Sequence, residues 1–221
     1  MIAPTTGPRP REAAMDLEML ARTRRSLHGV AEGVLAGPQY RATGTIRLRP
    51  SSHGFATVAA PALAVEGTDL VAGDRRLPLE GTYRSLALAA GVEWGPPEGL
   101  YHDHSGVDAD EPVEIEASSA ATLAAWLARA DEALRQLAPG ETPVLWPEHF
   151  DLAVTVDEVN YGASCGDAWS TEPYAYVGPW VTRTGDFWDA PFGAARRMSA
   201  LPDAEAVLAF YAEGRRRAVA G

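Results

Sequence analysis

Apolar residues alternate with polar ones in two separate stretches of the chain, residues 44–79 and residues 151–157. In the second stretch Leu152, Val154 and Val156 fall on one face of an extended strand, because successive side chains point to opposite faces. Segments with helical periodicity flank both stretches, so a helix-strands-helix pattern occurs twice. Strands grouped between helices favour an α+β fold with a mainly antiparallel sheet covered by helices.

The first helix is predicted for residues 13–35, where the apolar positions recur at helical spacing. Gly37-Pro38 is expected to stop it. Arg24 falls inside the apolar stripe of this helix, so either its stem packs while its charged head reaches water, or the helix is less regular than this pattern indicates.

Thr82 is expected to cap a short helix that runs through Ala90 and is ended by Gly91. The next helix is predicted to begin after a serine cap, Ser118 or Ser119, and to run to residue 137. The last helix is predicted from residue 202 or 203 to residue 217.

At 221 residues the chain is long enough for a full core, and we expect one domain over residues 13–217 after a mobile, Pro-rich segment at residues 1–12. No apolar run has the roughly 18 to 20 residues of a membrane span, and the N-terminus lacks the pattern of a secretory signal. A single cysteine, Cys165, agrees with a reducing compartment. These features predict a cytoplasmic protein without a membrane partner.

The formal net charge of -11 argues against a nucleic-acid partner, because phosphate binding requires clustered cations. The charge is uneven, since residues 1–49 carry a net +4 and the remaining chain carries -15. All 19 basic residues are Arg. Without Lys the chain cannot form a Schiff base, anchor pyridoxal phosphate or build a Walker-type phosphate loop. No cofactor is predicted.

Residues 144–193 contain 10 of the 18 aromatic residues, together with acids, an amide and hydroxyls. This composition is typical of a pocket that binds a small organic molecule, and equally of an aromatic core with an ordered loop. The predicted ligand-binding residues are Trp146, Asn160, Tyr161, Ser164, Asp167, Tyr174, Tyr176, Trp180 and Trp188.

An enzyme is the alternative to a binding protein. His149 and Glu158 flank the strand at residues 151–157 and are the candidate acid and base on a small substrate. The string Gly162-Ala163-Ser164-Cys165-Gly166 fits G-x-S-x-G, but no helix is predicted directly behind it and no histidine follows it, as a hydrolase nucleophile elbow requires. We interpret this string as a tight turn of small residues.

Two further interpretations concern metal binding and assembly. His102 and His104 lie in an acid-rich loop, residues 93–116, and are predicted to be solvated and to bind no metal, because a zinc site needs a third ligand. The aromatic residues around Phe187-Trp188 and Trp180 form the candidate patch for a homodimer.

Three short segments carry a resemblance to other proteins: Ser26-Leu27-His28 in the first helix, residues 44–48, and His-Phe-Asp-Leu-Ala-Val-Thr at residues 149–155. The chain resembles a broad group of uncharacterised bacterial proteins in which a Leu-His helix, an early strand meander and a late FDLAVT-like strand occur in this order. The resemblance covers most of the chain, and those segments are its specific part. The group has no established activity, so the resemblance implies no functional residue.

Overall fold

A computed structural model describes residues 10–101 and 104–219, with side chains described from residue 17 onward. The first group of strands is β1 (Leu48–Ser51), β2 (Gly54–Thr57), β3 (Leu63–Glu66), β4 (Asp69–Ala72) and β5 (Arg75–Pro78). The second group is β6 (Val144–Trp146), β7 (Asp151–Val156), β8 (Val159–Ser164), β9 (Tyr174–Pro179) and β10 (Ala194–Arg197). Within the described ranges these ten strands form one antiparallel sheet in the order β10-β9-β8-β7-β6-β1-β2-β3-β4-β5.

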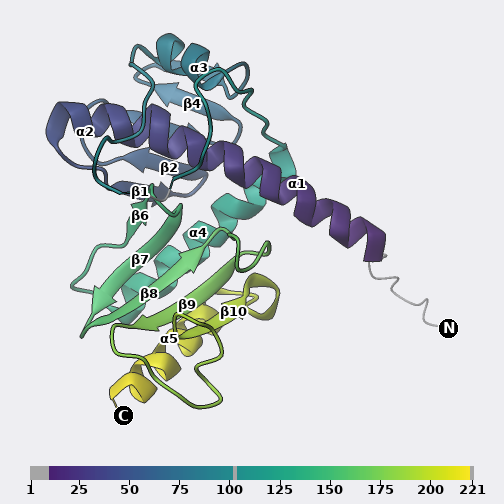
Figure 1. Ribbon diagram of the computed structural model, residues 1–221, viewed down its shortest axis with the longest axis vertical. Coiled ribbons are helices and arrows are strands. Elements are labelled where there is room, and N and C mark those ends of the chain that lie inside the picture. The colour runs from purple at the N-terminus through teal and green to yellow at the C-terminus, as the bar shows by residue number, and fades with distance from the viewer. Residues whose placement is uncertain (1–9, 102–103, 220–221) are drawn as a thin grey trace.

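The helices stand around the two groups of strands. They are α1 (Pro10–Gly29), the π-helical segment η1 (Val30–Ala36), α2 (Gly37–Thr43), α3 (Tyr83–Ala90), α4 (Ala117–Leu137), the 3-10 turn η2 (Met198–Ala200) and α5 (Ala204–Val219). Figure 1 shows the two groups of strands following one another down the molecule. The predicted α+β class, with its antiparallel sheet and repeated helix-strands-helix order, is confirmed.

The two groups of strands meet at a narrow junction. β1 pairs with β6 at one register position, Leu48 opposite Leu145, and both side chains are fully buried. The buried apolar residues of both groups nevertheless form one continuous core. Within the described residues, no helix is long and apolar enough to cross a membrane.

The prediction that Gly37-Pro38 ends the first helix is wrong. α1 continues without a break through η1 into α2, and the helix ends at Gly44, which takes the left-handed φ of 76°. Pro38 is tolerated because it falls in the first turn of α2 and because the wider π-helical turn before it changes the backbone pairing. The Gly33 carbonyl instead accepts a hydrogen bond of 3.0 Å from the Gly95 N–H of the crossing loop.

The other helix ends follow their capping signals. Thr82 and Ser85 form a capping box at the start of α3, and Gly91 ends that helix with a φ of 81°, as predicted. α4 begins at Ala117 because the Glu116 carboxylate caps it by accepting hydrogen bonds from the backbone N–H groups of Ser118 and Ser119. The predicted serine cap is therefore replaced by a glutamate two residues earlier.

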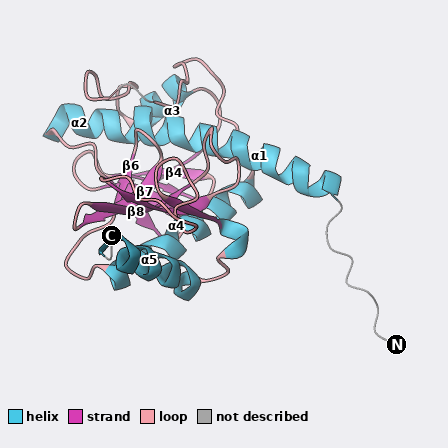
Figure 2. Cartoon of the chain, turned by 60° about the horizontal axis from the view of Figure 1, so that its bottom comes forward, coloured by secondary structure: helices cyan, strands magenta, loops and turns pink. Residues whose placement is uncertain are grey.

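Helices α4 and α5 cover one face of β7, β8 and β9. Figure 2 shows α5 on that side of the strands, and α1 on the opposite side. Leu152 and Val154 of β7 and Val177 of β9 point toward α4 and α5 and are buried. The Trp126 indole of α4 donates a hydrogen bond of 3.0 Å to the Ser164 carbonyl, and the Tyr211 hydroxyl of α5 donates one of 2.9 Å to the Gly162 carbonyl. These contacts fix the helices to one face of the strands.

Candidate functional site

The opposite face of β7, β8 and β9 carries a polar row. Asp151 pairs with Ser164, and Ser164 pairs with Tyr174, so the three side chains lie side by side across three strands. Because side chains alternate, none of them points toward α4 or α5. A cleft of about 950 Å³ lies over this face. That volume falls at the upper end of the range found for small-molecule sites.

The cleft is lined by residues from five parts of the chain. They are Arg24 and His28 of α1; His104; Glu148, His149 and Asp151; Asn160, Ser164, Gly166, Asp167, Ala168 and Trp169; and Tyr174, Tyr176, Gly178, Pro179, Trp180 and Phe192.

A buried carboxyl group lies on the floor of the cleft. The Tyr176 ring crosses the sheet over Gly162, and its hydroxyl donates a hydrogen bond to the Asp151 carboxyl. A methyl group on Gly162 would lie 2.4 Å from Cζ of Tyr176, so only glycine leaves room for the ring. Burial raises the pKa of Asp151, which the Tyr176 hydrogen bond opposes.

A second carboxylate closes one end of the polar row. Asp167 accepts hydrogen bonds from the backbone N–H groups of Trp169 (2.8 Å) and Ser170 (3.0 Å), and from the Tyr174 hydroxyl. The Ser164 hydroxyl accepts a hydrogen bond of 3.0 Å from the Gly166 N–H. The turn after β8 is therefore held rigid by its own polar side chains, which orders this end of the cleft.

The wall beside α1 is built from a histidine and a strained backbone. Phe150 has a φ of 52°, which is unfavourable for a bulky residue and places Asp151 at the start of β7. Its ring stacks on His28 with the centroids 5.7 Å apart. Nε2 of His28 is 2.7 Å from the Pro147 carbonyl, and burial lowers the pKa of His28 to about 4. His28 is therefore neutral at pH 7 and fixes the turn that presents His149.

The outer wall is aromatic. Trp169 packs edge-on against Tyr174 and Phe192 at centroid distances of 4.8 and 5.3 Å, and Phe192 stacks on Tyr174 at 5.9 Å. Trp180 stands at the other end of the cleft, 64% exposed, with its indole N–H 3.3 Å from Oδ1 of Asn160. Exposed rings around a polar floor are the arrangement that an organic ligand uses for contact area and orientation.

Six of the nine predicted ligand-binding residues lie together in this cleft: Asn160, Ser164, Asp167, Tyr174, Tyr176 and Trp180. The other three do not line it. Trp146 is on the same face of the sheet, but the Arg47 guanidinium lies 5.9 Å from its ring centroid. Tyr161 points to the helix-covered face, where it is buried against Tyr211, and Trp188 packs on Phe187. Strand alternation explains Tyr161, because its neighbour Asn160 takes the open face.

The structure does not bring His149 and Glu158 together. His149 lines the large cleft, with Nε2 3.2 Å from the Glu148 carboxylate, whereas Glu158 lies in the two-residue turn between β7 and β8. The length of β7 separates them, since six extended residues span about 20 Å. Glu158 borders a separate cavity of about 60 Å³ between that turn and α5.

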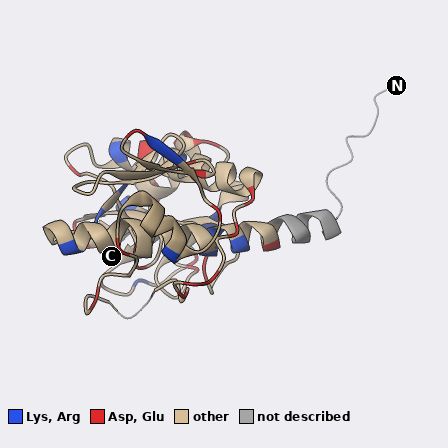
Figure 3. Cartoon of the chain, turned by 90° about the horizontal axis from the view of Figure 1, so that it is seen from above, with Lys and Arg blue, Asp and Glu red and all other residues tan. Residues whose placement is uncertain are grey.

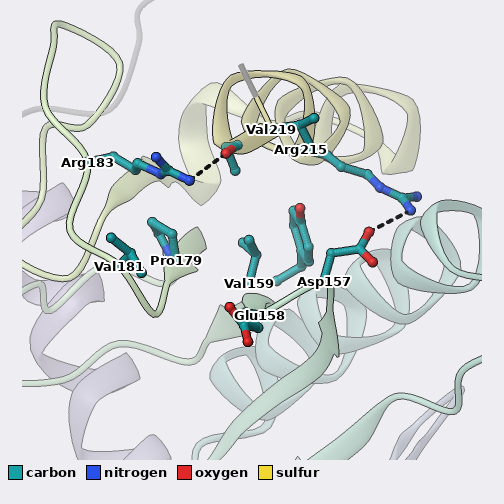
Figure 4. Close-up of a pocket in the computed structure, with 10 residues that line it drawn as sticks. Asp157, Glu158, Val159, Pro179, Val181, Arg183, Arg215 and Val219 are labelled. Atoms are coloured by element: carbon teal, nitrogen blue, oxygen red, sulfur yellow. Dashed lines mark hydrogen bonds and ion pairs between the residues drawn. The ribbon is translucent and has the colours of Figure 1, made fainter. Parts of the chain in front are cut away.

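Figure 4 shows this smaller cavity, with Arg183 and Arg215 on its two sides. The Arg183 guanidinium donates a hydrogen bond of 2.7 Å to the Ala218 carbonyl, and the Arg215 guanidinium lies 3.2 Å from the Asp157 carboxylate. Both arginines thus tie the end of α5 to neighbouring segments. At about 60 Å³ the cavity is several times smaller than the roughly 300–1,000 Å³ of typical small-molecule sites.

The G-x-S-x-G string is not a tight turn. Residues 162–164 belong to strand β8, and the turn begins only at Gly166. Cys165 is fully buried, and burial raises the pKa of its thiol to about 12. A thiol that stays protonated is a poor nucleophile, which removes the cysteine from the candidate chemistry.

Two further predictions concern the histidine pair His102 and His104 and the candidate dimer patch. His102 lies outside the described residues, while His104 is exposed and lines the cleft. Among the side chains that are described, no group of three or more His, Cys, Asp or Glu residues is placed to hold a metal ion. In the candidate dimer patch, Trp180 is exposed, but the Phe187 ring is 8% exposed and packs against Phe210.

Sequence reasoning missed several residues of the cleft, notably Arg24, His28, Asp151 and Phe192. Arg24 gave a signal, because a charged residue inside an apolar stripe requires a partner or a path to water. Comparisons of the chain with protein-family models, with curated proteins and with solved structures found no match. Function is therefore inferred from the chemistry of the cleft.

Proposed function

We propose that the protein binds a small organic molecule in the cleft over β7, β8 and β9. One observation carries this proposal: helices cover one face of these strands, while a cleft of about 950 Å³ lies over the other. The uncovered face combines a buried carboxyl, tyrosine hydroxyls and exposed tryptophans. A sheet face that served only as core would carry apolar residues under a covering layer, as the α4 and α5 side does.

Fluorine NMR on protein labelled with 5-fluorotryptophan tests the proposal. The six tryptophans report on different places, since Trp169 and Trp180 line the cleft whereas Trp126 of α4 is fully buried. Titration with pools of small aromatic compounds is expected to shift the resonances of Trp169 and Trp180 and to leave Trp126 unchanged. Shifts confined to Trp146 or Trp188, or no shift with any pool, would contradict the proposal.

Proton transfer is a second candidate function of the same cleft. It is favoured by the raised pKa of Asp151, by the Tyr176 hydroxyl bonded to it and by the nearby His149 ring, since perturbed titratable groups in a cleft are typical of acid-base sites. Mass spectrometry of a bound compound after prolonged incubation in deuterium oxide separates the two functions. Deuterium incorporated at carbon by the wild type but not by Asp151→Asn supports catalysis, and an unchanged mass supports binding alone.

A further inference from the structure

Arg24 has an unusual place among the arginines of α1. Its neighbours are paired at the surface, with Arg22 2.7 Å from the Glu18 carboxylate and Arg25 2.7 Å from that of Glu111. Nη1 of Arg24 is buried at the wall of the cleft, and no described residue accepts a hydrogen bond from it. Figure 3 shows basic residues in blue along this helix. Arg24 therefore points toward the cleft, whereas Arg22 and Arg25 form ion pairs at the surface.

Burying one nitrogen of a guanidinium without a hydrogen-bond acceptor is costly. Arg remains charged in proteins, so burial cannot be relieved by loss of a proton at neutral pH. Burial lowers the pKa of Arg24, and the nearby Asp167 carboxylate opposes this only in part. The Asp167 carboxylate accepts hydrogen bonds from Trp169, Ser170 and Tyr174, and none from Nη1 of Arg24. Among the residues that the structure describes, none therefore supplies an anion to Nη1 of Arg24.

The turn after β8 makes room for this guanidinium. A methyl group on Gly166 would lie 2.8 Å from Nη1 of Arg24 and 2.6 Å from the Thr171 carbonyl. Gly166 also has a φ of 99°, which side-chain-bearing residues rarely adopt. Because Ser164 and Tyr174 stand beside the same turn, the head of Arg24 lies at the polar end of the cleft.

We propose that Arg24 is the anion-binding group of the cleft and that the ligand is a small aromatic carboxylate. This inference rests on the proposed function. The guanidinium fork matches a carboxylate, while Trp169, Tyr174 and Phe192 offer ring faces and edges to the apolar part of the ligand. A single negative charge fits better than a phosphate dianion, because Glu148, Asp151 and Asp167 also line the cleft and repel additional charge.

Matched pairs of compounds test the assignment: benzoate with benzamide, phenylacetate with phenylacetamide, and indole-3-acetate with indole-3-acetamide, with inorganic phosphate as a further probe. The wild type is expected to bind the carboxylates at least about tenfold more tightly than the amides, as a charge-assisted hydrogen bond contributes. Arg24→Gln is expected to abolish this preference while retaining amide binding. Arg22→Gln, on the same helix but at the surface, is the matched control and is expected to keep the preference.

The outcomes separate this inference from the proposed function. Equal binding of carboxylates and amides by the wild type, or a preference that survives in Arg24→Gln, overturns the role of Arg24 and leaves the cleft as a binding site. Phosphate bound more tightly than the carboxylates overturns the ligand class. Binding of no probe contradicts both proposals. Thermal unfolding adds a readout, since removing an unpaired buried charge is expected to raise the melting temperature of Arg24→Gln, whereas a packing role predicts a fall.

Discussion

Gly162→Ala is expected to disrupt the floor of the cleft. Its added methyl group would lie 2.4 Å from Cζ of Tyr176 and 2.7 Å from the Leu152 carbonyl oxygen. Nonbonded carbon atoms prefer separations of about 3.5–4.0 Å, so the Tyr176 ring has to move by roughly 1 Å or more. That movement breaks the hydrogen bond between the Tyr176 hydroxyl and the Asp151 carboxyl.

The free energy of unfolding is expected to fall by about 2–4 kcal/mol. Overpacking of a filled site costs about 1–3 kcal/mol, and a lost hydrogen bond adds about 0.5–1.5 kcal/mol. For a chain of this size each kcal/mol corresponds to about 2–4 °C in melting temperature, so the predicted decrease is roughly 4–16 °C.

Gly178→Ala is the matched control for this variant. Gly178 is also a strand glycine that lines the cleft, and neither glycine has a positive φ. The nearest atom to an added methyl group at Gly178 is the Phe192 carbonyl oxygen at 3.4 Å, which is an ordinary contact. Thermal unfolding followed by circular dichroism is expected to place this variant within about 0.5 kcal/mol of the wild type or above it. Equal melting temperatures for the two variants would refute the packing argument.

Three further predictions concern pH and reactivity. Burial lowers the pKa of His28 to about 4, so the unfolded chain takes up a proton before the folded protein does as the pH falls from about 6.5 to 4. The free energy of unfolding is therefore expected to decrease by on the order of 3 kcal/mol over that window. Urea unfolding at pH 6.5 and pH 4 is expected to show a smaller decrease in His28→Phe than in the wild type. Hydrogen bonds from the first turn of α4 lower the pKa of Glu116 to about 2. Glu116→Gln is therefore expected to lower the melting temperature at pH 7 and to match the wild type near pH 2. An equal effect of Glu114→Gln would contradict the capping role. Cys165 is expected to resist iodoacetamide at pH 8 until urea unfolds the chain, as mass spectrometry detects, and labelling of the folded protein would contradict its burial.

Local patterns predicted much of the fold. Alternation along residues 151–157 located β7, and the Thr82 and Gly91 signals located α3 to the residue. The first helix was predicted to end too early, because a Gly-Pro pair usually stops a helix. Its continuation depends on the π-helical turn η1 and on the hydrogen bond from Gly95 to the Gly33 carbonyl, and a contact over 60 residues apart leaves no local signal.

The candidate site was less accessible to sequence reasoning. Composition pointed to residues 144–193, and Ser164 and Tyr176 from that stretch lie in the cleft. Composition cannot state which face of a strand stays uncovered, so Tyr161 was grouped with its neighbour although it faces α5. Arg24 gave a signal as a charged residue in an apolar stripe, but its place in the cleft could not be predicted, because its position beside Gly166 follows from the way α1 packs against the sheet.

A crystallographic soak with the aromatic carboxylate panel tests the central claim most directly. The account predicts ligand density over β7, β8 and β9, with a carboxylate oxygen within hydrogen-bonding distance of the Arg24 guanidinium and a ring against Trp169 or Phe192. Density at another surface of the molecule, or a cleft that stays free of every compound at millimolar concentration, would contradict it.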